Sequence, residues 1–423
     1  MLLMASLPFD MFYSHLILVS FAIHTLIHLN KNAIKPVFKI RTLMLQSVFF
    51  ITALSTIYAI NKPAAFDEWG KHIAIFIFPL VFCLNPLDLK KYRHRLLMCF
   101  ALVCTATIAY LYLDALMVIK HYQLPLKALF SGAFTNHNFS QPIDMHATFF
   151  SMQIAVSLVY ILSVLIKERA SLKKMLYLVC AGILTAGLIQ LSSKSVFIAL
   201  IVTIDAALPY FLLVGKRRIK YMAVIASITV LAVLVIFNSN VFRERYFNEL
   251  KVDLSKTAQG SATDSRLARW DVAIGLIGKA PVIGYGAGSE MGLLHEEFFN
   301  KKLFNSYLNG LNAHSEYLSL LLKSGIIGLL VYLATLAFGF NIAFRQKDIL
   351  LFTFITLIAI VSLSEDLFDV DKGTCFYAFF FAFFVFSNED SESNLTPVGK
   401  IETLAIKNKN NFRLNTEELK LTQ

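Results

Sequence analysis

Charged residues and cysteines are both scarce in this chain of 423 residues. Asp, Glu, Lys and Arg together make up 16% of it, against about 25% in typical soluble domains. The five cysteines fall within or at the edge of hydrophobic runs, which favours packing over a disulfide framework or a metal site. They are Cys83, Cys99, Cys104, Cys180 and Cys375. The first hydrophobic run has no basic n-region and no small-residue cleavage site, so we expect a retained helix rather than a signal peptide.

Apolar side chains are abundant instead. Hydrophobic residues make up 57% of the chain and Phe alone occupies 38 positions, which excludes an ordinary soluble domain. Because a membrane-spanning helix needs about 20 apolar residues, the runs predict an all-α membrane protein with about 11 spanning helices, within a range of roughly 10 to 12. The predicted spans are residues 11–30, 42–60, 72–85, 96–119, 146–166, 175–191, 195–214, 219–237, 326–343, 349–363 and 374–388.

Basic residues mark alternate connections between these spans. Four connections carry four Lys or Arg each and a fifth carries two, namely NKNAIKPVFKIR, PLDLKKYRHR, KERASLKK, GKRRIK and FRQKD. The connections at 61–71, 120–145, 192–194 and 364–373 carry one or two each. Since basic flanks stay in the cytoplasm during insertion, we predict an N-terminus outside and a C-terminus in the cytoplasm. The net charge of +11 then reflects topology and contact with anionic membrane lipids, and nucleic-acid binding is not needed to explain it.

This alternation divides the chain into four parts. We expect an N-terminal bundle of about eight helices at 1–237, a large outward loop at 238–323, C-terminal spanning helices at 324–388 and a polar cytoplasmic tail at 389–423. The loop is the natural place for function, because connections of this length are usually functional or disordered.

An amphipathic helix is predicted inside the loop, in the stretch DSRLARWDVAIGLIGKAP. Asp264 or Ser265 can cap its start, and Pro281 can end it. Apolar residues recur on one face, at Leu267, Trp270, Ile274 and Ile277. Arg266 and Arg269 would project from the first turns, either as anion-binding side chains or as a solvated face.

A histidine stands at the end of the loop, in NAHSEYLSLLLKSGIIGLLVYL. The apolar run that follows is too long for one untilted span, and KSG, which ends at Gly325, interrupts it. We therefore predict a short helix at 313–323 on the outer membrane surface, followed by a spanning helix. His314 would lie outside, beside Glu316 and Tyr317, as a base or as a capping residue.

Three further features lie in outward connections. IDMHATFF places His146 at the start of the fifth span, and LSSKSVF places Lys194 in a short turn. SLSEDLFDVDKG places four carboxylates before the last span: Glu365, Asp366, Asp369 and Asp371. Cations near the outer headgroup plane suit a phosphate-bearing lipid, although a lysine in such a position can also simply end a helix.

Two other patterns allow a structural explanation. The glycines of GYGAGSE follow a helix rather than a strand, so a turn is favoured over a phosphate loop. Asp205 lies deep in the seventh predicted span. A carboxylate there needs a partner and serves either the structure or a proton relay.

Taken in order, HATFFSM, LSSKSVFIAL, SRLARWDVAIGLIGKAPVIGYGAG, NAHSEYLSLLLKSGIIGL and SLSEDLFDVDKGTCFYAFFF resemble the O-antigen ligase and O-antigen polymerase family of polytopic membrane glycosyltransferases. The resemblance covers roughly residues 140–390. Its most specific part is the histidine followed by a Tyr-Leu helix and a Gly-x-x-Gly break, preceded by an Arg-bearing helix and a glycine turn. This chain differs in Lys194, where many members have Arg, and in HSEYL, where His-Asn-x-Tyr-Leu is commoner. A lysine keeps the charge but loses the bidentate fork.

The resemblance implies an enzyme of the bacterial inner membrane that takes a glycan from an undecaprenyl diphosphate carrier and passes it to an acceptor hydroxyl on the periplasmic side. It implies His314 and Arg266 as catalytic residues, and Lys194, Arg266 and Arg269 as ligands of the diphosphate. The supporting residues would be His146, Glu316, Tyr317 and Glu365. An imidazole suits the activation of a hydroxyl, and cationic side chains can stabilise the departing diphosphate. No metal and no cofactor are therefore expected.

The acceptor stays open at this point. The first candidate reaction joins O-antigen to the lipid A-core of lipopolysaccharide. The second is an O-antigen or capsule polymerase, or a protein O-oligosaccharyltransferase, with the same site. The third candidate, from another class, is a transporter of lipid-linked glycan. A transporter should show internal repeats and ionisable residues near the midplane. This sequence has no clear repeat, and its ionisable cluster lies at the outer rim, which favours an enzyme.

Overall fold

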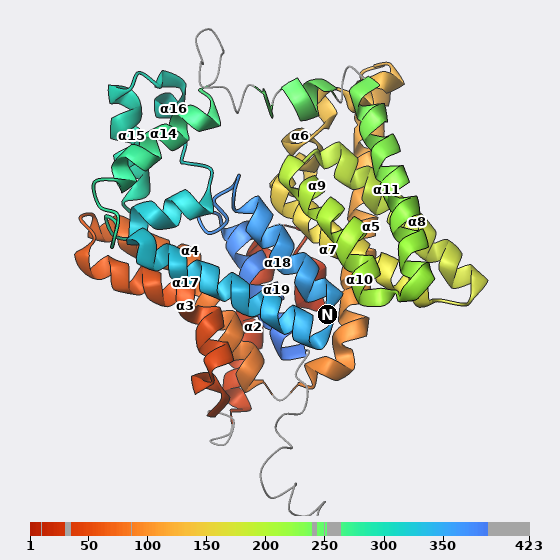
Figure 1. Ribbon diagram of the computed structural model, residues 1–423, viewed down its shortest axis with the longest axis horizontal. Helices are drawn as coiled ribbons and strands as arrows, with labels where there is room; N and C mark the ends of the chain where they lie inside the picture. Colours follow the sequence, from red (N-terminus) through yellow and green to blue (C-terminus); the bar gives the residue numbers. More distant parts are fainter. Residues whose placement is uncertain are drawn as a thin grey trace, which may run out of the picture.

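The structure, a computed structural model, describes residues 1–9, 11–29, 35–85, 87–238, 243–248, 250–251 and 264–387. Within these residues the protein is helical and contains no strand, as the composition predicts. The helices form two groups, one on each side of α18 and α19 (Figure 1). The tail predicted at 389–423 and residues 252–263 of the predicted loop lie outside the described residues.

A helix lies at each of the eleven predicted spans. Ten of these positions hold one helix each: α2 Met11–Ile27, α3 Ile40–Ser55, α4 Lys62–Leu84, α5 Leu89–His121, α7 Ala147–Lys167, α8 Ser171–Leu191, α11 Gly215–Asn238, α17 Glu316–Gln346, α18 Ile349–Val361 and α19 Asp371–Ser387. At the remaining position, α9 Lys194–Ile201 continues through a π-helical turn at Val202–Ala207 into α10 Leu208–Leu212.

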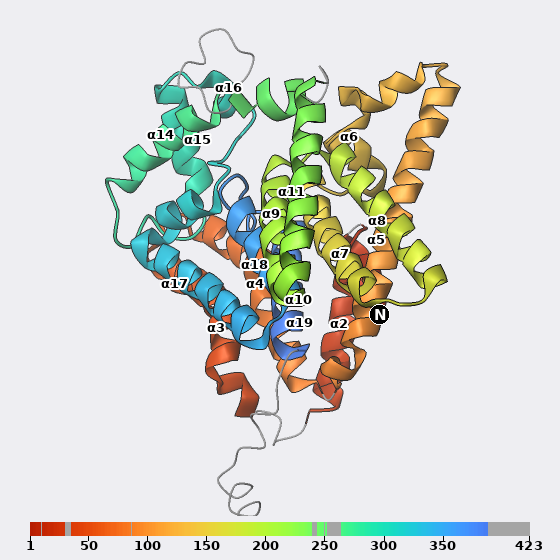
Figure 2. The same ribbon diagram turned by 45° about the vertical axis from the view of Figure 1, so that its right-hand side comes forward.

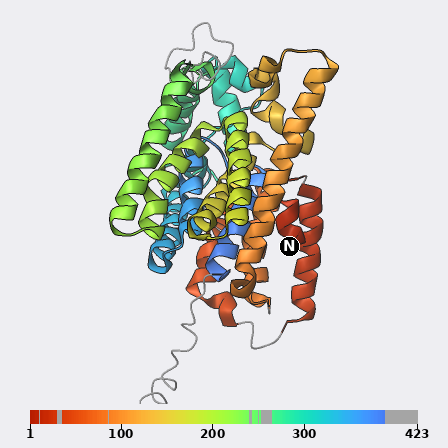
Figure 3. The same ribbon diagram turned by 90° about the vertical axis from the view of Figure 1, so that its right-hand side faces the viewer.

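Within the described ranges, six helical stretches are long and apolar enough to cross a membrane. They are Ile40–Tyr58, Leu89–His121, Ala147–Lys167, Ser171–Leu191, Lys194–Leu212 and Glu316–Gln346. The helices Phe12–Ile27 and Ile349–Val361 are apolar but shorter. The chain is therefore a membrane protein by its helices, and the number of crossings stays a prediction. At 33 residues, α5 has a length of roughly 50 Å, and it extends well past its neighbours (Figure 3).

The shorter elements lie mostly at one end of the bundle. The remaining α-helices are α1 Leu2–Ser6, α6 His137–Ser140, α14 Arg266–Ile277, α15 Glu290–Asn300 and α16 Phe304–Leu308. Single turns of 3-10 helix lie at Lys35–Phe38, Thr56–Tyr58, Leu126–Phe130, Gly132–Phe134 and Gln141–Ile143, and a π-helical turn lies at Glu244–Asn248. Helices α14, α15 and α16 stack above the ends of α4 and α17, on the same end of the bundle as α6 (Figures 1 and 2).

The centre of the bundle is built from α7 and α19. Every residue of α19 from Gly373 to Ser387 is buried, and so is α7 from Ala147 to Ile161. The phenylalanines of α19 contact one another and Phe354 of α18 with ring centroids 5.0 to 6.3 Å apart. Because lipid tails are as apolar as these side chains, close packing of the rings rather than exclusion of water holds the helices together.

Asp205 has a partner in the neighbouring helix. The Thr229 hydroxyl of α11 donates to its carboxylate over 3.3 Å, next to the π-helical turn that contains Asp205. This contact supports the structural explanation for a carboxylate inside an apolar span.

Helix α17 is broken at Gly325, as the KSG signal predicts. Gly325 has φ 61° and ψ −160°, so the helix divides into a piece that starts at Glu316 and a longer piece that starts at Ile326. A break of this kind interrupts the hydrogen-bond ladder and leaves backbone groups that must find other partners away from water. The first piece begins at Glu316 rather than at the predicted residue 313, because residues 312–315 form a non-helical connection with a bend at His314.

The loop after α14 supplies these partners. Tyr285 N donates to Leu322 O over 2.8 Å, Gly286 N donates to Lys323 O over 2.9 Å, and Ile326 N donates to Pro281 O over 2.9 Å. The glycine turn of GYGAGSE is thus a backbone connector rather than a phosphate loop.

Two glycines allow this close approach of backbones. A Cβ atom on Gly325 would collide with the backbone of Val282, and one on Gly284, which has φ 68°, would collide with the carbonyl of Leu322. Both positions therefore combine a left-handed backbone with a contact that no side chain can share.

A buried charge cluster lies beside the break. Lys323 Nζ is 3.0 Å from Glu68 Oε1 and 3.4 Å from Glu290 Oε2, and all three side chains are buried. The Gly288 backbone N–H donates to Glu68, and the Ser319 hydroxyl donates to Glu290. Because these partners belong to α4, α15, α17 and the glycine turn, the ions fix the loop against the bundle. Removing one member of such a buried group typically costs about 3–5 kcal/mol.

Helix α14 forms where predicted but turns a different face inward. Ser265 caps it by accepting from Ala268 N over 3.2 Å, and it ends at Gly278, before Pro281. The buried residues are Arg269, Val272, Ala273 and Leu276, whereas Ile274 is 56% exposed. The predicted apolar face is therefore wrong. Both faces of α14 carry apolar residues, and packing against Leu294, Phe298 and Leu322 of α15 and α17 decides which one is covered.

We expect Gly325→Ala to lower the thermal unfolding temperature of the purified protein in detergent, because alanine there is both strained in φ and in collision with Val282. Gly275→Ala on α14 is the matched control, since a Cβ at Gly275 meets nothing within 4 Å and alanine favours a helix by up to about 1 kcal/mol. Equal unfolding temperatures for the two variants would show that the break does not need glycine.

Candidate functional site

The candidate site starts from two connections that lie against each other, residues 312–316 ahead of α17 and residues 362–365 after α18. Glu316 N donates to Ser362 O over 3.0 Å and to Glu365 O over 3.2 Å. The Ser315 hydroxyl also donates to Ser362 O, over 3.4 Å. These bonds hold the start of α17 against the end of α18 and fix the backbone around His314.

His314 has a left-handed backbone with φ 48°. Its N–H donates to the Asn312 side-chain oxygen over 3.1 Å, the kind of local bond that makes this conformation accessible. The imidazole then faces the other connection, with Nδ1 3.8 Å from Glu365 Oε2, and the side chain is 30% exposed. A ligand can therefore reach the ring while a carboxylate stands behind it.

Glu365 is a buried carboxylate that lies beside His314 and Arg266. The Thr148 hydroxyl of α7 donates to its Oε1 over 3.2 Å. Burial alone would raise the pKa of Glu365, but the side chain of His314 and the charge of Arg266 outweigh burial and hold the pKa below its usual range. Glu365 thus stays ionised at neutral pH and can orient and stabilise a charged imidazole.

Side chains of α14 donate hydrogen bonds to backbone carbonyls of both connections. Arg266 Nη1 donates to Ser364 O over 2.8 Å, Arg269 Nη1 donates to Asn312 O over 3.4 Å, and Trp270 Nε1 donates to Ala313 O over 2.8 Å. Arg269 is only 5% exposed, so it does not belong to a solvated face. Arg266 is less buried and lies beside the charge of Glu365.

His146 forms the edge of the site next to α7. Its ring centroid lies 4.2 Å from that of His137 and 4.8 Å from that of Phe149. Burial lowers the pKa of His146 from 6.5 to about 4, against the opposing effect of Glu365. At neutral pH this ring is therefore uncharged, so it offers a phosphate no positive charge.

The other predicted residues lie farther from the imidazole or point elsewhere. Glu316 Oε2 accepts from Phe368 N over 2.9 Å, and the Tyr317 hydroxyl donates to Ala359 O over 2.8 Å, so both side chains tie α17 to the segment that contains the site. Lys194 is the first residue of α9, two residues after left-handed Ser192. Helix α9 packs along α18, whose end leads into the 362–365 connection.

The four predicted carboxylates have separate surroundings. Only Glu365 is paired with His314 among the described contacts. Asp369 pairs with Lys71 over 2.7 Å, and although burial opposes it, the charges of Lys323 and Lys71 hold the pKa of Asp369 well below its usual range. Asp371 lies 3.6 Å from His15. Burial, together with neighbouring carboxylates, holds the pKa of the fully enclosed Asp366 well above its usual range.

Sequence reasoning missed four residues of this arrangement. They are Asn312, Thr148, Trp270 and His137. The proximity of Thr148 to His146 in HATFF was a usable signal, because residues two apart at a helix start can both face one connection. Trp270 was assigned to the apolar face of α14, although its indole N–H requires an acceptor when the ring is half-buried.

This arrangement defines a class of protein: a helical membrane protein with an accessible imidazole, a buried carboxylate and a guanidinium at one end of its bundle. A comparison with protein families narrows that class. Residues 179–333 match the family model described as O-antigen ligase, Wzy_C, so the resemblance read from the motifs is confirmed for that part of the chain. The matched stretch contains Lys194, Arg266, Arg269 and His314, whereas His146 and Glu365 lie outside it. No curated protein matches the chain.

The buried state of His146 predicts a pH dependence of stability. Because its pKa is lower in the folded protein than the ordinary 6.5, the neutral ring contributes stability above pH 6.5 that is lost as the pH falls towards about 4. Wild-type protein should therefore lose thermal stability more steeply between these values than His146→Gln, which cannot take up a proton. Parallel slopes for the two proteins in a detergent unfolding series would contradict this assignment.

Proposed function

We propose that the protein transfers a glycan from an undecaprenyl diphosphate carrier to an acceptor hydroxyl on the periplasmic side of the bacterial inner membrane, as an O-antigen ligase acting on the lipid A-core. The observation that carries the proposal is the accessible His314 imidazole backed by ionised Glu365. The family match supports a protein of O-antigen ligase or polymerase type, and the helices support a membrane location.

In the proposed reaction, His314 accepts the proton of the acceptor hydroxyl while its oxygen attacks the anomeric carbon. The bond from that carbon to the diphosphate oxygen breaks, and the carrier diphosphate leaves with the electron pair. Glu365 stabilises the imidazolium that forms, in the way that a carboxylate assists a histidine base. A positioned base of this kind typically contributes about 100-fold to 10,000-fold.

Arg266 is the proposed partner of the departing diphosphate. It stands at the first turn of α14 and lies beside the charge of Glu365. The proposed base and the proposed anion site would therefore both border Glu365. Lys194 would add a second positive charge from the start of α9. Electrostatic stabilisation of developing charge by fixed cations is commonly the largest single contribution to such a reaction. Buried Arg269 is proposed to act through the Asn312 backbone that it holds.

We expect His314→Ala to lower transfer by roughly 100-fold or more, measured with purified protein and defined lipid-linked donor. Donor binding should survive, because the cations that hold the diphosphate are on other elements. His295→Ala is the matched control, since this exposed histidine of α15 stacks on Tyr307 with centroids 4.0 Å apart, away from His314. Normal turnover of His314→Ala would refute the base role.

Removing the charge of Arg266 should affect the donor instead. Arg266→Ala should lose donor binding and transfer with protein levels intact, whereas Lys194→Arg should be tolerated because it keeps the charge and adds a bidentate fork. Loss of transfer in Arg266→Ala with donor binding unchanged would move Arg266 out of the anion site.

The acceptor is tested in cells by a lipopolysaccharide gel of a deletion strain. A ligase predicts loss of the whole O-antigen ladder while lipid-linked glycan accumulates. A single-repeat band would indicate a polymerase instead, and an unchanged ladder with unglycosylated proteins would indicate transfer to protein. Loss of the ladder with donor trapped on the cytoplasmic side would indicate a transporter.

A further inference from the structure

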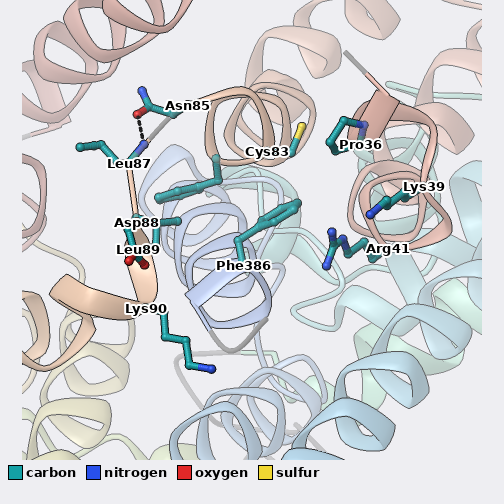
Figure 4. A pocket seen from close by; sticks show the side chains of 11 residues that line it. Pro36, Lys39, Arg41, Cys83, Asn85, Leu87, Asp88, Leu89, Lys90 and Phe386 are labelled. Atoms are coloured by element: carbon teal, nitrogen blue, oxygen red, sulfur yellow. Dashed lines mark hydrogen bonds between the residues drawn. The ribbon is translucent and has the colours of Figure 1, made fainter. Parts of the chain in front are cut away.

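The opposite end of the bundle carries a second polar cavity, of about 450 Å³. It lies where α3 and α5 begin and where α4 and α19 end, whereas the candidate site lies where α17 and α19 begin. Lys39, Arg41 and Lys90 line it together with a single carboxylate, that of Asp88 (Figure 4). The cavity is therefore a net cationic site that the proposed reaction does not use.

The acceptors in this cavity already have partners in the backbone. Asp88 caps α5 by accepting from Lys91 N over 3.1 Å, and the Asn85 side-chain oxygen accepts from Leu87 N over 3.1 Å. The start of α3 has no side-chain cap at Lys39, so its positive helix end adds to the charge of the cations. The described carboxylate that lines the cavity, Asp88, is thus engaged with the backbone through one of its oxygens.

Arg41 is held in position for such a contact. Its guanidinium carbon lies 5.5 Å from the centroid of the Phe386 ring, near the end of α19. Figure 4 shows Lys39 and Arg41 side by side on one wall and Lys90 on another. Arg93, one turn further along α5, is paired with Asp348 over 2.7 Å and does not line the cavity.

An apolar cavity of about 490 Å³ adjoins the cationic one. Phe82, Leu87 and Leu89 line both cavities. The apolar cavity continues along α2, α5 and α19, and its further lining includes Phe21, Leu96, Phe379 and Phe383. Each cavity is in the size range of small-molecule sites. A ligand that fills both must be anionic at one end and hydrocarbon at the other.

We propose that these joined cavities bind an anionic glycerophospholipid of the cytoplasmic leaflet, with its phosphodiester among Lys39, Arg41 and Lys90 and an acyl chain in the apolar cavity. The charge pattern of the connections puts this end of the bundle on the cytoplasmic side, where anionic headgroups attract basic pockets between helices. The bound lipid would tie α3, α5 and α19 together at the end farthest from the candidate site.

The test uses purified full-length protein in a neutral detergent, titrated with phosphatidylglycerol, phosphatidylcholine or glycerol 3-phosphate. Native mass spectrometry counts bound lipid, and thermal unfolding reports stabilisation. Phosphatidylglycerol should bind saturably and raise the unfolding temperature more than phosphatidylcholine does. Combined Lys39→Gln, Arg41→Gln and Lys90→Gln should weaken this binding by roughly 100-fold, and Arg41→Gln alone by about fivefold.

The matched control combines Lys173→Gln, Lys174→Gln and Lys216→Gln, which remove the same charge from other basic connections on the same end. It should bind phosphatidylglycerol like wild type. Equal weakening in both triple variants would overturn the proposal, because the attraction would then be diffuse. Glycerol 3-phosphate binding as tightly as the lipid would also overturn it, since the apolar cavity would contribute nothing.

One segment of the chain itself is a competing occupant. The sequence after Ser387 continues with three carboxylates, Glu389, Asp390 and Glu392. Glu389→Gln, Asp390→Asn and Glu392→Gln together should leave phosphatidylglycerol affinity within about threefold of wild type. A gain of tenfold or more would show that the tail fills the cationic cavity in the intact protein, and the lipid proposal would fail.

Discussion

The backbone break at Gly325 is the constraint on which the rest of the site depends. A helix interrupted inside an apolar bundle is stable only if other groups take over its hydrogen bonds, and here the loop from Pro281 to Gly286 does so. The same loop carries α14 to one side and α15 to the other, so closing the broken ladder also fixes the helix that grips the site. The ion pairs of Lys323 with Glu68 and Glu290 also hold α17 against α4 and α15.

Two groups of ionised residues consequently perform different tasks a short distance apart. Around Lys323 the charges are buried and mutually paired at the edge of a cavity of about 220 Å³, and the pairing suits a structural joint. Around Glu365 one carboxylate faces a partly exposed histidine, and the neighbouring guanidinium is held through a neutral carbonyl. The second arrangement keeps charge within reach of solvent, and this distinguishes the place where chemistry is proposed from the place where the fold is joined.

Local sequence patterns predicted the features that depend mainly on residues close together in the chain. Apolar runs of membrane length located every long helix, Ser265 predicted the start of α14, and KSG predicted the break in α17. The inward face of α14 could not be predicted, because Ile274 and Val272 are equally apolar and only the position of α15 and α17 separates them. Among the four acidic residues from Glu365 to Asp371, nothing in their spacing distinguished Glu365, whose surroundings are set by Thr148 of α7 and by His314 ahead of α17. The prediction that Lys194 and Arg269 bind the diphosphate likewise rests on the resemblance.

The hydrogen bonds from α14 to the two connections affect how the sequence of this region can vary in evolution. Arg266, Arg269 and Trp270 hold main-chain carbonyls rather than side chains of the opposing connections. A carbonyl is present whatever residue occupies its position, so Ser364 and Ala313 can be substituted without removing these bonds. The requirement of these bonds for particular side chains is thereby concentrated on one helix. The connections can consequently vary at positions such as Ser364, whereas the side chains of Asn312, His314 and Glu365 must stay to keep the imidazole beside the carboxylate.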